Sequence, residues 1–331
     1  MAAASTMTPP ASGQPARPLR RWLQLAAPFA GLALVILFFA LVTGSPGSFL
    51  SSANLRVVLA QTVIVALGAI GMTVIIVSGG IDLSVGAVIA LTSVVTALAL
   101  NHGLPPGVAL LLGVAAGGAV GLVNGLAITR LRVVPFIATL GMLGVARGLA
   151  KYLANQQTVN SPATWLNELA VSFPSRPWLL VSPGVWIAVL FAVVMGLVLD
   201  RTVFGRRVFA VGSNEAAARA CGIQVDRLKL WIYGVGGLFF GLAGVMQMSR
   251  LRQGDPTVVV GVELDVIAAV VIGGGSLNGG EGSILGAMVG ALIMAFLRSG
   301  CLHMGWANYV QEIIIGTVIV VAVAIDRYRT R

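Results

Sequence analysis

Long apolar runs separated by short polar intervals occupy most of the 331-residue sequence. Six runs without a glycine-rich interruption fall at 22–43, 107–128, 133–153, 183–199, 230–248 and 309–325. A helix needs about 20 apolar residues to cross a bilayer, and each run is close to that length. The pattern predicts an all-α polytopic membrane protein. Composition agrees, since 10% of the residues are charged, whereas soluble domains carry about 25%.

Two longer apolar stretches, 55–100 and 263–297, are interrupted by glycine-rich segments that contain polar residues. The first interruption reads SGGIDLSVG and the second reads GGGSLNGG. Each stretch is too long for one crossing, and paired glycines break a helix. Non-helical backbone at membrane depth is tolerated only where it is buried in protein or lines a wet cavity. We therefore expect roughly ten transmembrane helices, or about eight if the breaks are re-entrant.

The two breaks resemble each other, which predicts an internal repeat. VIIVSGGIDLSVGAVIALT and AVVIGGGSLNGGEGSILGAMVG share an apolar run, a glycine cluster, a small polar tip and a glycine-spaced apolar run. Free backbone groups at such breaks can bind solute hydroxyls. The candidate pathway or gate residues are Gly79, Gly80, Asp82, Ser84, Gly274, Ser276 and Asn278. For Asp82, a simple role as cap of the following helix is an equally weighted alternative.

One apolar run carries a glycine at every fourth position. These glycines are Gly113, Gly117, Gly121 and Gly125. Residues four apart share one face of a helix, and a face without side chains lets a neighbouring helix approach closely. We assign these glycines to helix packing.

Basic residues set the expected orientation. The interval 201–229 is polar and strongly basic, and Lys and Arg concentrate on the cytoplasmic side of membrane proteins. We therefore expect 201–229 to be a cytoplasmic loop, 154–181 to be the largest external segment, and both termini to be cytoplasmic. Residues 1–20 read as a disordered tail, and residues 21–331 as one transmembrane domain. Orientation and anionic lipid explain the net charge of +10 without a nucleic-acid partner.

The basic loop is expected to contain a short helix. Asn214 can cap a helix, EAAARA is a run of good helix formers, and Gly222 ends it. One interpretation is a solvated amphipathic connector. The other is a docking helix for a soluble partner.

Several classes of chemistry are excluded or disfavoured by what the sequence lacks. It contains no GxxxxGK[ST] phosphate loop, so we expect no ATP hydrolysis by this chain. His102 and His303 are isolated, so no metal site is expected, and no Ser, His and Asp arrangement supports hydrolysis. Acidic residues near the membrane sit at breaks or span ends, which weighs against ion-gradient-driven secondary transport but leaves it open. A structural membrane subunit without a pathway also remains possible.

Four ordered segments resemble the permease subunits of bacterial ABC sugar importers, in the branched group that includes ribose and xylose permeases. They are GMTVIIVSGGIDLSVGAVIALT from Gly71, VPFIATLGMLGVARGLA from Val134, FGRRVFAVGSNEAAARACGI from Phe204 and ELDVIAAVVIGGGSLNGGEGSILGAMVGALI from Glu263. They span almost the whole chain after its N-terminal tail. Together they are far more specific than any one glycine-rich piece.

The resemblance implies a bacterial inner-membrane permease that carries a monosaccharide and is not itself an enzyme. Its implied partners are two ATPase subunits or one tandem ATPase, a periplasmic sugar-binding protein, a second permease copy or a similar chain, and membrane lipid. ATP and Mg would bind to the ATPase, and this chain would bind no cofactor. The loop bearing the EAA-like sequence would be the coupling helix, with Asn214, Glu215, Ala216, Ala217, Arg219 and Gly222. In the general importer pattern the glycine lies one position nearer to the EAA sequence and a Leu-Pro follows further on. This chain has neither feature.

Overall fold

The computed structural model describes residues 18–174 and 179–329, so the N-terminal tail expected at 1–20 lies largely outside the described residues. Within them the chain is helical apart from loops and one pair of two-residue strands. The helices are α1 (Pro18–Val42), α2 (Pro46–Phe49), α3 (Ser52–Val77), α4 (Val85–Asn101), α5 (Pro106–Thr129), α6 (Pro135–Leu153), α7 (Pro183–Arg201), α8 (Val203–Ser213), α9 (Glu215–Ala220), α10 (Val225–Leu251), α11 (Val262–Ile272), α12 (Ile284–His303) and α13 (Asn308–Arg329). A short 3-10 helix covers Trp165–Glu168.

Six of these helices, α3, α5, α6, α7, α10 and α12, are long and apolar enough to cross a membrane. Shorter apolar helical segments lie at Ala26–Val42 in α1, Val85–Asn101 and Tyr309–Val321 in α13. The all-α polytopic fold is therefore confirmed. Both broken stretches do supply two helices each, but α11 has 11 residues and at 1.5 Å per residue reaches only about half the bilayer core.

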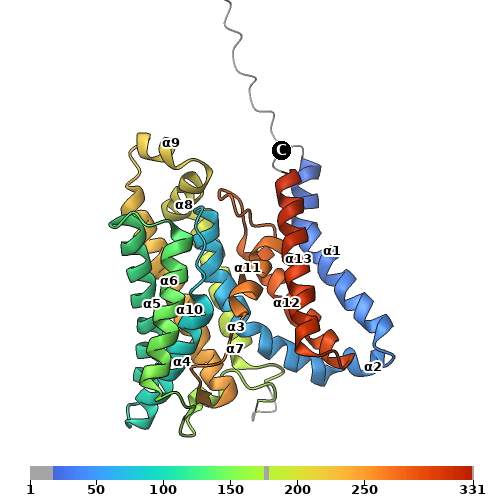
Figure 1. The fold of residues 1–331 in the computed structure, drawn as a ribbon. Helices are drawn as coiled ribbons and strands as arrows, with labels where there is room; N and C mark the ends of the chain where they lie inside the picture. The colour runs from blue at the N-terminus through green and yellow to red at the C-terminus, as the bar shows by residue number, and fades with distance from the viewer. Residues whose placement is uncertain (1–17, 175–178, 330–331) are drawn as a thin grey trace, which may run out of the picture.

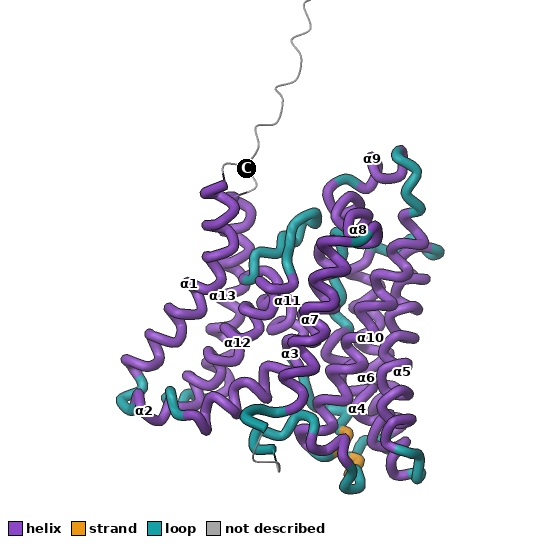
Figure 2. Tube along the Cα trace, turned by 180° about the vertical axis from the view of Figure 1, so that it is seen from behind, coloured by secondary structure: helices purple, strands orange, loops and turns teal. Residues whose placement is uncertain are grey.

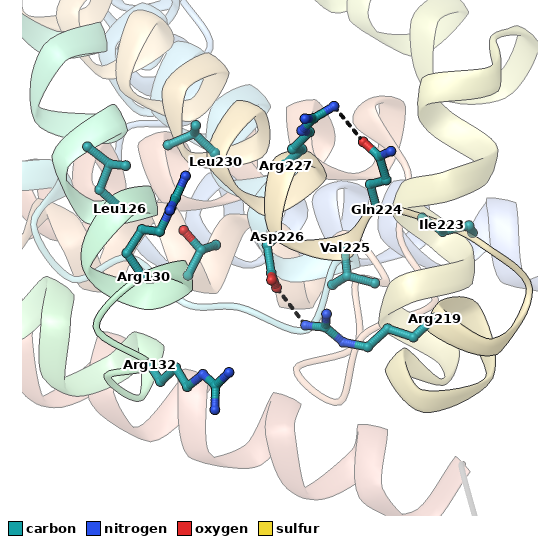
Figure 3. A pocket seen from close by; sticks show the side chains of 11 residues that line it. Leu126, Arg130, Arg132, Arg219, Ile223, Gln224, Val225, Asp226, Arg227 and Leu230 are labelled. Atoms are coloured by element: carbon teal, nitrogen blue, oxygen red, sulfur yellow. Dashed lines mark hydrogen bonds and ion pairs between the residues drawn. The ribbon is translucent and has the colours of Figure 1, made fainter.

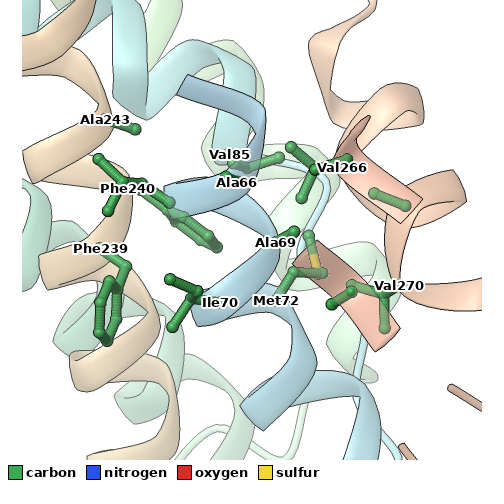
Figure 4. Close-up of a cluster of buried hydrophobic side chains, with 14 of the residues drawn as sticks. Ala66, Ala69, Ile70, Met72, Val85, Phe239, Phe240, Ala243, Val266 and Val270 are labelled. Atoms are coloured by element: carbon green, nitrogen blue, oxygen red, sulfur yellow. The ribbon is translucent and has the colours of Figure 1, made fainter. Parts of the chain in front are cut away.

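The helix α3 is the centre of the molecule. In its most apolar window 89% of the residues are buried inside the protein, against 17% for α6. Figure 4 shows why: Ile70 faces Phe240 of α10, while Ala69 and Met72 face Val266 and Val270 of α11. A helix that is apolar all round suits a site enclosed by other helices.

The helices α5 and α10 pack backbone against backbone. A Cβ added at Gly117 would overlap the carbonyl oxygen of Gly237, and one at Gly121 would overlap that of Tyr233. A Cβ at Gly125 would come within 3.0 Å of Leu230, and at Gly113 it would overlap the hydroxyl of Thr96 in α4. The glycine-bearing face of α5 therefore lets α10 and α4 approach closely.

The two ends of the molecule differ in what they carry. The short helices α8 and α9, the start of α1 and the end of α13 lie at one end, which we call the α9 end (Figures 1 and 2). The segment 154–174 lies at the opposite end. There its strand β1 (Val159–Asn160) pairs with β2 (Gln253–Gly254), which follows α10.

Candidate functional site

The helix α9 has a well-defined start and stop. The Asn214 side chain accepts a hydrogen bond from the Ala217 backbone N–H at 2.9 Å, which satisfies one of the free donors of the first turn. Gly222 follows the helix with a φ of +82°, a conformation that glycine adopts without a steric penalty. Ala216 and Ala217 are exposed, while Ala218 is buried beneath them. The result is a short helix that presents small side chains outward.

Ion pairs fasten α9 to the start of α10. Glu215 lies 2.6 Å from Lys229 and 3.1 Å from Arg219, and Arg219 lies 2.6 Å from Asp226. Partial burial acts to raise the pKa of Glu215, but hydrogen bonds and charges from Lys229 and Arg219 outweigh it and hold the pKa below its ordinary value. The hydrogen bonds from Arg219 to Asp226 and Glu215 raise the pKa of Arg219. The carboxylate of Glu215 thus remains charged near neutral pH.

A basic hollow of about 550 Å³ lies beside α9. Its charged lining includes Arg130 and Arg132 from the α5–α6 connection, and Arg219, Asp226 and Arg227 around α9 and α10 (Figure 3). Arg219 is hydrogen-bonded to Asp226, and Arg227 to Gln224. The side chain of Arg132 lies apart from both pairs (Figure 3). Such a surface suits contact with an acidic protein surface.

The end of α8, just before α9, touches both breaks. A Cβ at Gly212 would overlap the Val77 carbonyl oxygen and would lie 2.6 Å from the Gly280 nitrogen. A Cβ at Gly279 would lie 2.8 Å from the Gly212 oxygen and 2.9 Å from Gly79. The Gly280 N–H also donates to the Val77 carbonyl at 2.8 Å. We call Val77, Gly79, Gly212, Gly279 and Gly280 the glycine junction.

The first break, 78–84, is organised by Asp82. This residue is 1% exposed, and its Oδ1 accepts hydrogen bonds from the Ser84 N–H at 2.8 Å and the Ser84 hydroxyl at 2.6 Å. Its Oδ2 accepts from Asn124 Nδ2 of α5 at 3.1 Å. The Leu83 N–H donates to Thr139 Oγ1 of α6 at 3.2 Å. Asp82 therefore both shapes the turn into α4 and ties it to a neighbouring helix.

The second break, 273–283, is closed by its own backbone. The Ser276 N–H donates to the Glu281 carbonyl at 3.1 Å, and the Gly279 N–H donates to the Ser276 carbonyl at 3.0 Å. The Asn278 N–H lies 3.3 Å from Ser276 Oγ. Gly274 has a φ of +92° and open space where a Cβ would point.

The structure thus brings the predicted coupling residues together in one helix and its flanks, and brings the two predicted breaks together at Gly79 and Gly279. Sequence reasoning missed α8 as an element. Its signal is present, because Phe204, Val208 and Val211 recur at helical spacing opposite arginines. Sequence reasoning also missed Asn124 and Gly212, which acquire their roles only through contacts with distant segments.

No group of three or more His, Cys, Asp or Glu side chains that could hold a metal ion occurs in the described part of the chain. The two cysteines there are free, with Cys221 exposed after α9 and Cys301 buried in α12.

Residues 54–323 match the family model described as branched-chain amino acid transport system / permease component. The chain belongs to this family. As a permease component it is a multi-pass, non-catalytic membrane subunit of the ABC permease kind. No solved structure matches it significantly.

Curated relatives cover almost all of this permease. It is 40% identical to the ribose import permease protein RbsC of Escherichia coli over 89% of this chain and 92% of the relative. It is 37% identical to the L-arabinose ABC transporter permease protein AraH of Azospirillum brasilense over 91% of this chain and 88% of the relative. It is 34% identical to the fructose import permease protein FrcC of Rhizobium meliloti over 92% of this chain and 85% of the relative.

Proposed function

We propose that this permease forms the membrane pathway of an ATP-driven bacterial importer for a monosaccharide of the ribose, arabinose or fructose class. Support comes from relatives named as ribose and fructose import permeases and as an L-arabinose ABC transporter permease. The structural observation that carries the proposal is the contact of α8 with both breaks, immediately before the exposed helix α9. Through this contact, an ATPase docked at α9 could transmit its movement to the two breaks.

In this proposal the α9 end faces the cytoplasm, together with both termini, and the segment 154–181 faces outward. The basic residues around α9 fit this orientation. Two ATPase subunits or one tandem ATPase bind ATP and Mg and dock at α9, while a periplasmic sugar-binding protein delivers sugar at the opposite end. A second copy of this permease, or a similar chain, completes the pathway in the inner membrane. The helices α5, α6 and α7 are sparsely buried, so their exposed faces can contact lipid or the second permease copy.

The proposed coupling route runs through Asn214, Glu215, Ala216, Ala217, Arg219 and Gly222. The ion pairs of Glu215 and Arg219 join α9 to the start of α10, and in this proposal the two move together. The junction then passes movement of α8 to Val77 and Gly280, since close-packed backbone cannot yield by side-chain rotation. ATPase closure would in this way shift the two breaks between inward-facing and outward-facing arrangements.

The pathway residues in this proposal are Gly79, Gly80, Asp82 and Ser84 in the first break and Gly274, Ser276 and Asn278 in the second. Movement of either break would expose backbone polar groups that a sugar hydroxyl can bind. In this proposal the burial of Asp82, which is 1% exposed, corresponds to a closed state of this route.

The test is purification of the permease in nanodiscs with its candidate ATPase, followed by co-elution and ATP turnover. Glu215→Arg removes the acidic partner of Lys229 and adds a like charge, so the variant should lose both readouts. Glu168→Arg is the matched control, since Glu168 is exposed at the opposite end. If the wild type binds no ATPase, or if Glu215→Arg behaves like the control, the docking proposal fails. Sugar uptake driven by an ion gradient without ATPase would instead support a secondary carrier.

A further inference from the structure

Five buried polar atoms of α10 and α11 have no hydrogen-bond partner among the described residues. One is the Tyr233 hydroxyl near the first break, and the other four lie in the last two turns of α10 and the first turn of α11. These four are Gln247 Oε1, Arg250 Nε, Glu263 Oε2 and Asp265 Oδ1. Gln247 is 2% exposed and Asp265 is 1% exposed. Burying such atoms without a partner is destabilising, and most of all for charged groups. A site that leaves several of them together is suited to a ligand that supplies the missing bonds.

Three of these atoms, those of Arg250, Glu263 and Asp265, belong to a connected set of charged side chains, and Gln247 lies one turn before Arg250 in α10. Asp265 Oδ2 forms an ion pair with Arg298 of α12 at 2.5 Å, and Arg298 is close enough to Arg250 for their charges to interact. Glu263 interacts electrostatically with both Asp265 and Arg147 of α6. Together with Asp255, which also interacts with Arg147, they form what we call the charged cluster: Arg147, Arg250, Asp255, Glu263, Asp265 and Arg298.

The cluster lies in the half of the molecule away from α9. Arg250 is in the last turn of α10, which leads into β2 at the opposite end. Glu263 and Asp265 are in the first turn of α11. A Cβ added at Gly86 would overlap Glu263 Oε2, so the carboxylate faces the start of α4 just beyond the first break. The cluster therefore occupies the space between the outer end and the two breaks.

The loop before α11 is held to the cluster by Arg147. Its Nη1 donates to the carbonyls of Pro256 at 3.1 Å and Val258 at 2.7 Å. Glu263 Oε1 accepts from the Gly261 N–H at 3.2 Å. These bonds use one oxygen of Glu263 and leave Oε2 without a partner. Some polar atoms of the cluster therefore hold the loop before α11 in place, while others remain available to bind a ligand.

The chemistry of the cluster indicates the class of ligand. Three arginines and three carboxylates give a net charge of zero, which favours a neutral molecule over an ion. The available atoms are one N–H donor and three oxygen acceptors, and a hydroxyl group can serve both kinds. We propose that the charged cluster, with Gln247, is a weak binding site for a neutral polyhydroxylated ligand, namely the carried monosaccharide, on the outer side of the breaks.

This inference rests on the proposed function, but it is tested without transport. D-Ribose, L-arabinose and D-fructose are offered to the full-length permease in nanodiscs, and binding is followed by saturation-transfer NMR. D-Gluconate, an anionic polyol, serves as comparison. At least one neutral sugar should bind, and gluconate should bind less. If gluconate binds better than every neutral sugar, or if no sugar binds, the proposal is overturned.

Two conservative variants locate the site. In Glu263→Gln the amide oxygen can still accept from the Gly261 N–H, while the free acceptor is replaced by an N–H donor. In Asp265→Asn the amide oxygen can still accept from Arg298, while the free acceptor is again replaced by a donor. Each should weaken sugar binding about tenfold, the effect of one lost charged hydrogen bond. Lys151→Gln, an exposed change on α6, should bind like the wild type.

Thermal melting of the same samples separates a binding role from a merely structural one. If Glu263→Gln and Asp265→Asn lower the melting temperature but the folded protein binds sugar like the wild type, the cluster is structural and the proposal falls. Uptake by the complete importer is measured separately. Uptake in the wild type without sugar binding at the cluster would overturn this inference and leave the proposed function standing. Absence of ATP-driven uptake would overturn the proposed function instead.

Discussion

The two helix breaks lie against each other, yet different parts of the chain hold them in place. The first is tied to neighbouring helices by side chains, through Asp82 to Asn124 of α5 and through Leu83 to Thr139 of α6. The second closes on itself through backbone hydrogen bonds around Ser276, and its Gly280 N–H reaches Val77.

This difference teaches how two similar sequence patterns can serve different mechanical purposes. A side-chain network fixes one arrangement, because each buried partner is costly to leave unpaired. Backbone contacts between glycines depend on shape and have no side chain to reposition. We therefore expect the first break to be sensitive to polarity, and the junction of the second break with Gly212 to be sensitive to size.

The largest effect should come from Gly212→Ala. The added Cβ would overlap the Val77 carbonyl oxygen, so α8 must move away from both breaks. Overpacking of this kind costs about 1–3 kcal/mol and occasionally more, and sugar uptake by the reconstituted importer should fall about tenfold or more. ATP turnover stimulated by the loaded binding protein should fall with it.

The matched control for this change is Gly141→Ala. Gly141 is also in a helix, and nothing lies within 4 Å of its added Cβ, so both variants gain the same helix propensity. Equal uptake by the two variants would show that the glycine junction does not transmit movement.

A smaller effect is expected at Asp82. Asp82→Ala leaves the Ser84 N–H and hydroxyl without their acceptor and leaves Asn124 Nδ2 with Ser84 Oγ alone. The change should cost about 1–3 kcal/mol, measured as a lower melting temperature in detergent. Asp82→Asn can keep both hydrogen bonds from Ser84 while losing the acceptor for Asn124. Normal uptake in Asp82→Asn would reduce Asp82 to a cap, and strongly impaired uptake with normal melting would support a gate.

The smallest effect should follow Gly274→Ala in the second break. No atom lies where the Cβ would go, but the backbone φ is +92°. The cost is then conformational strain, about 1–2 kcal/mol, and uptake should fall less than in Gly212→Ala. A loss of uptake as large as that of Gly212→Ala would mean that the second break depends on local flexibility and not on contact with α8.

Much of the fold could be predicted from local signals. The glycine pairs located both breaks, and Asn214, EAAARA and Gly222 located α9, because caps and helix propensity act over a few residues. The length of α11 was harder to predict, since its apolar run continues into the glycines. Asn124 and Gly212 could not be assigned, because an amide in an apolar helix and a glycine in a basic segment acquire a role only from what lies beside them.

The glycine junction also bears on how the protein is made. The chain leaves the ribosome from its N-terminus, so α8 and α9 are complete well before Gly279 and Gly280 are synthesised. Gly212 can reach its final seat only after the chain through α11 and the second break has been inserted. The surface around α9 therefore reaches its final form only after the second break is in place, and a motor that recognises this form would not bind chains that end before Gly280.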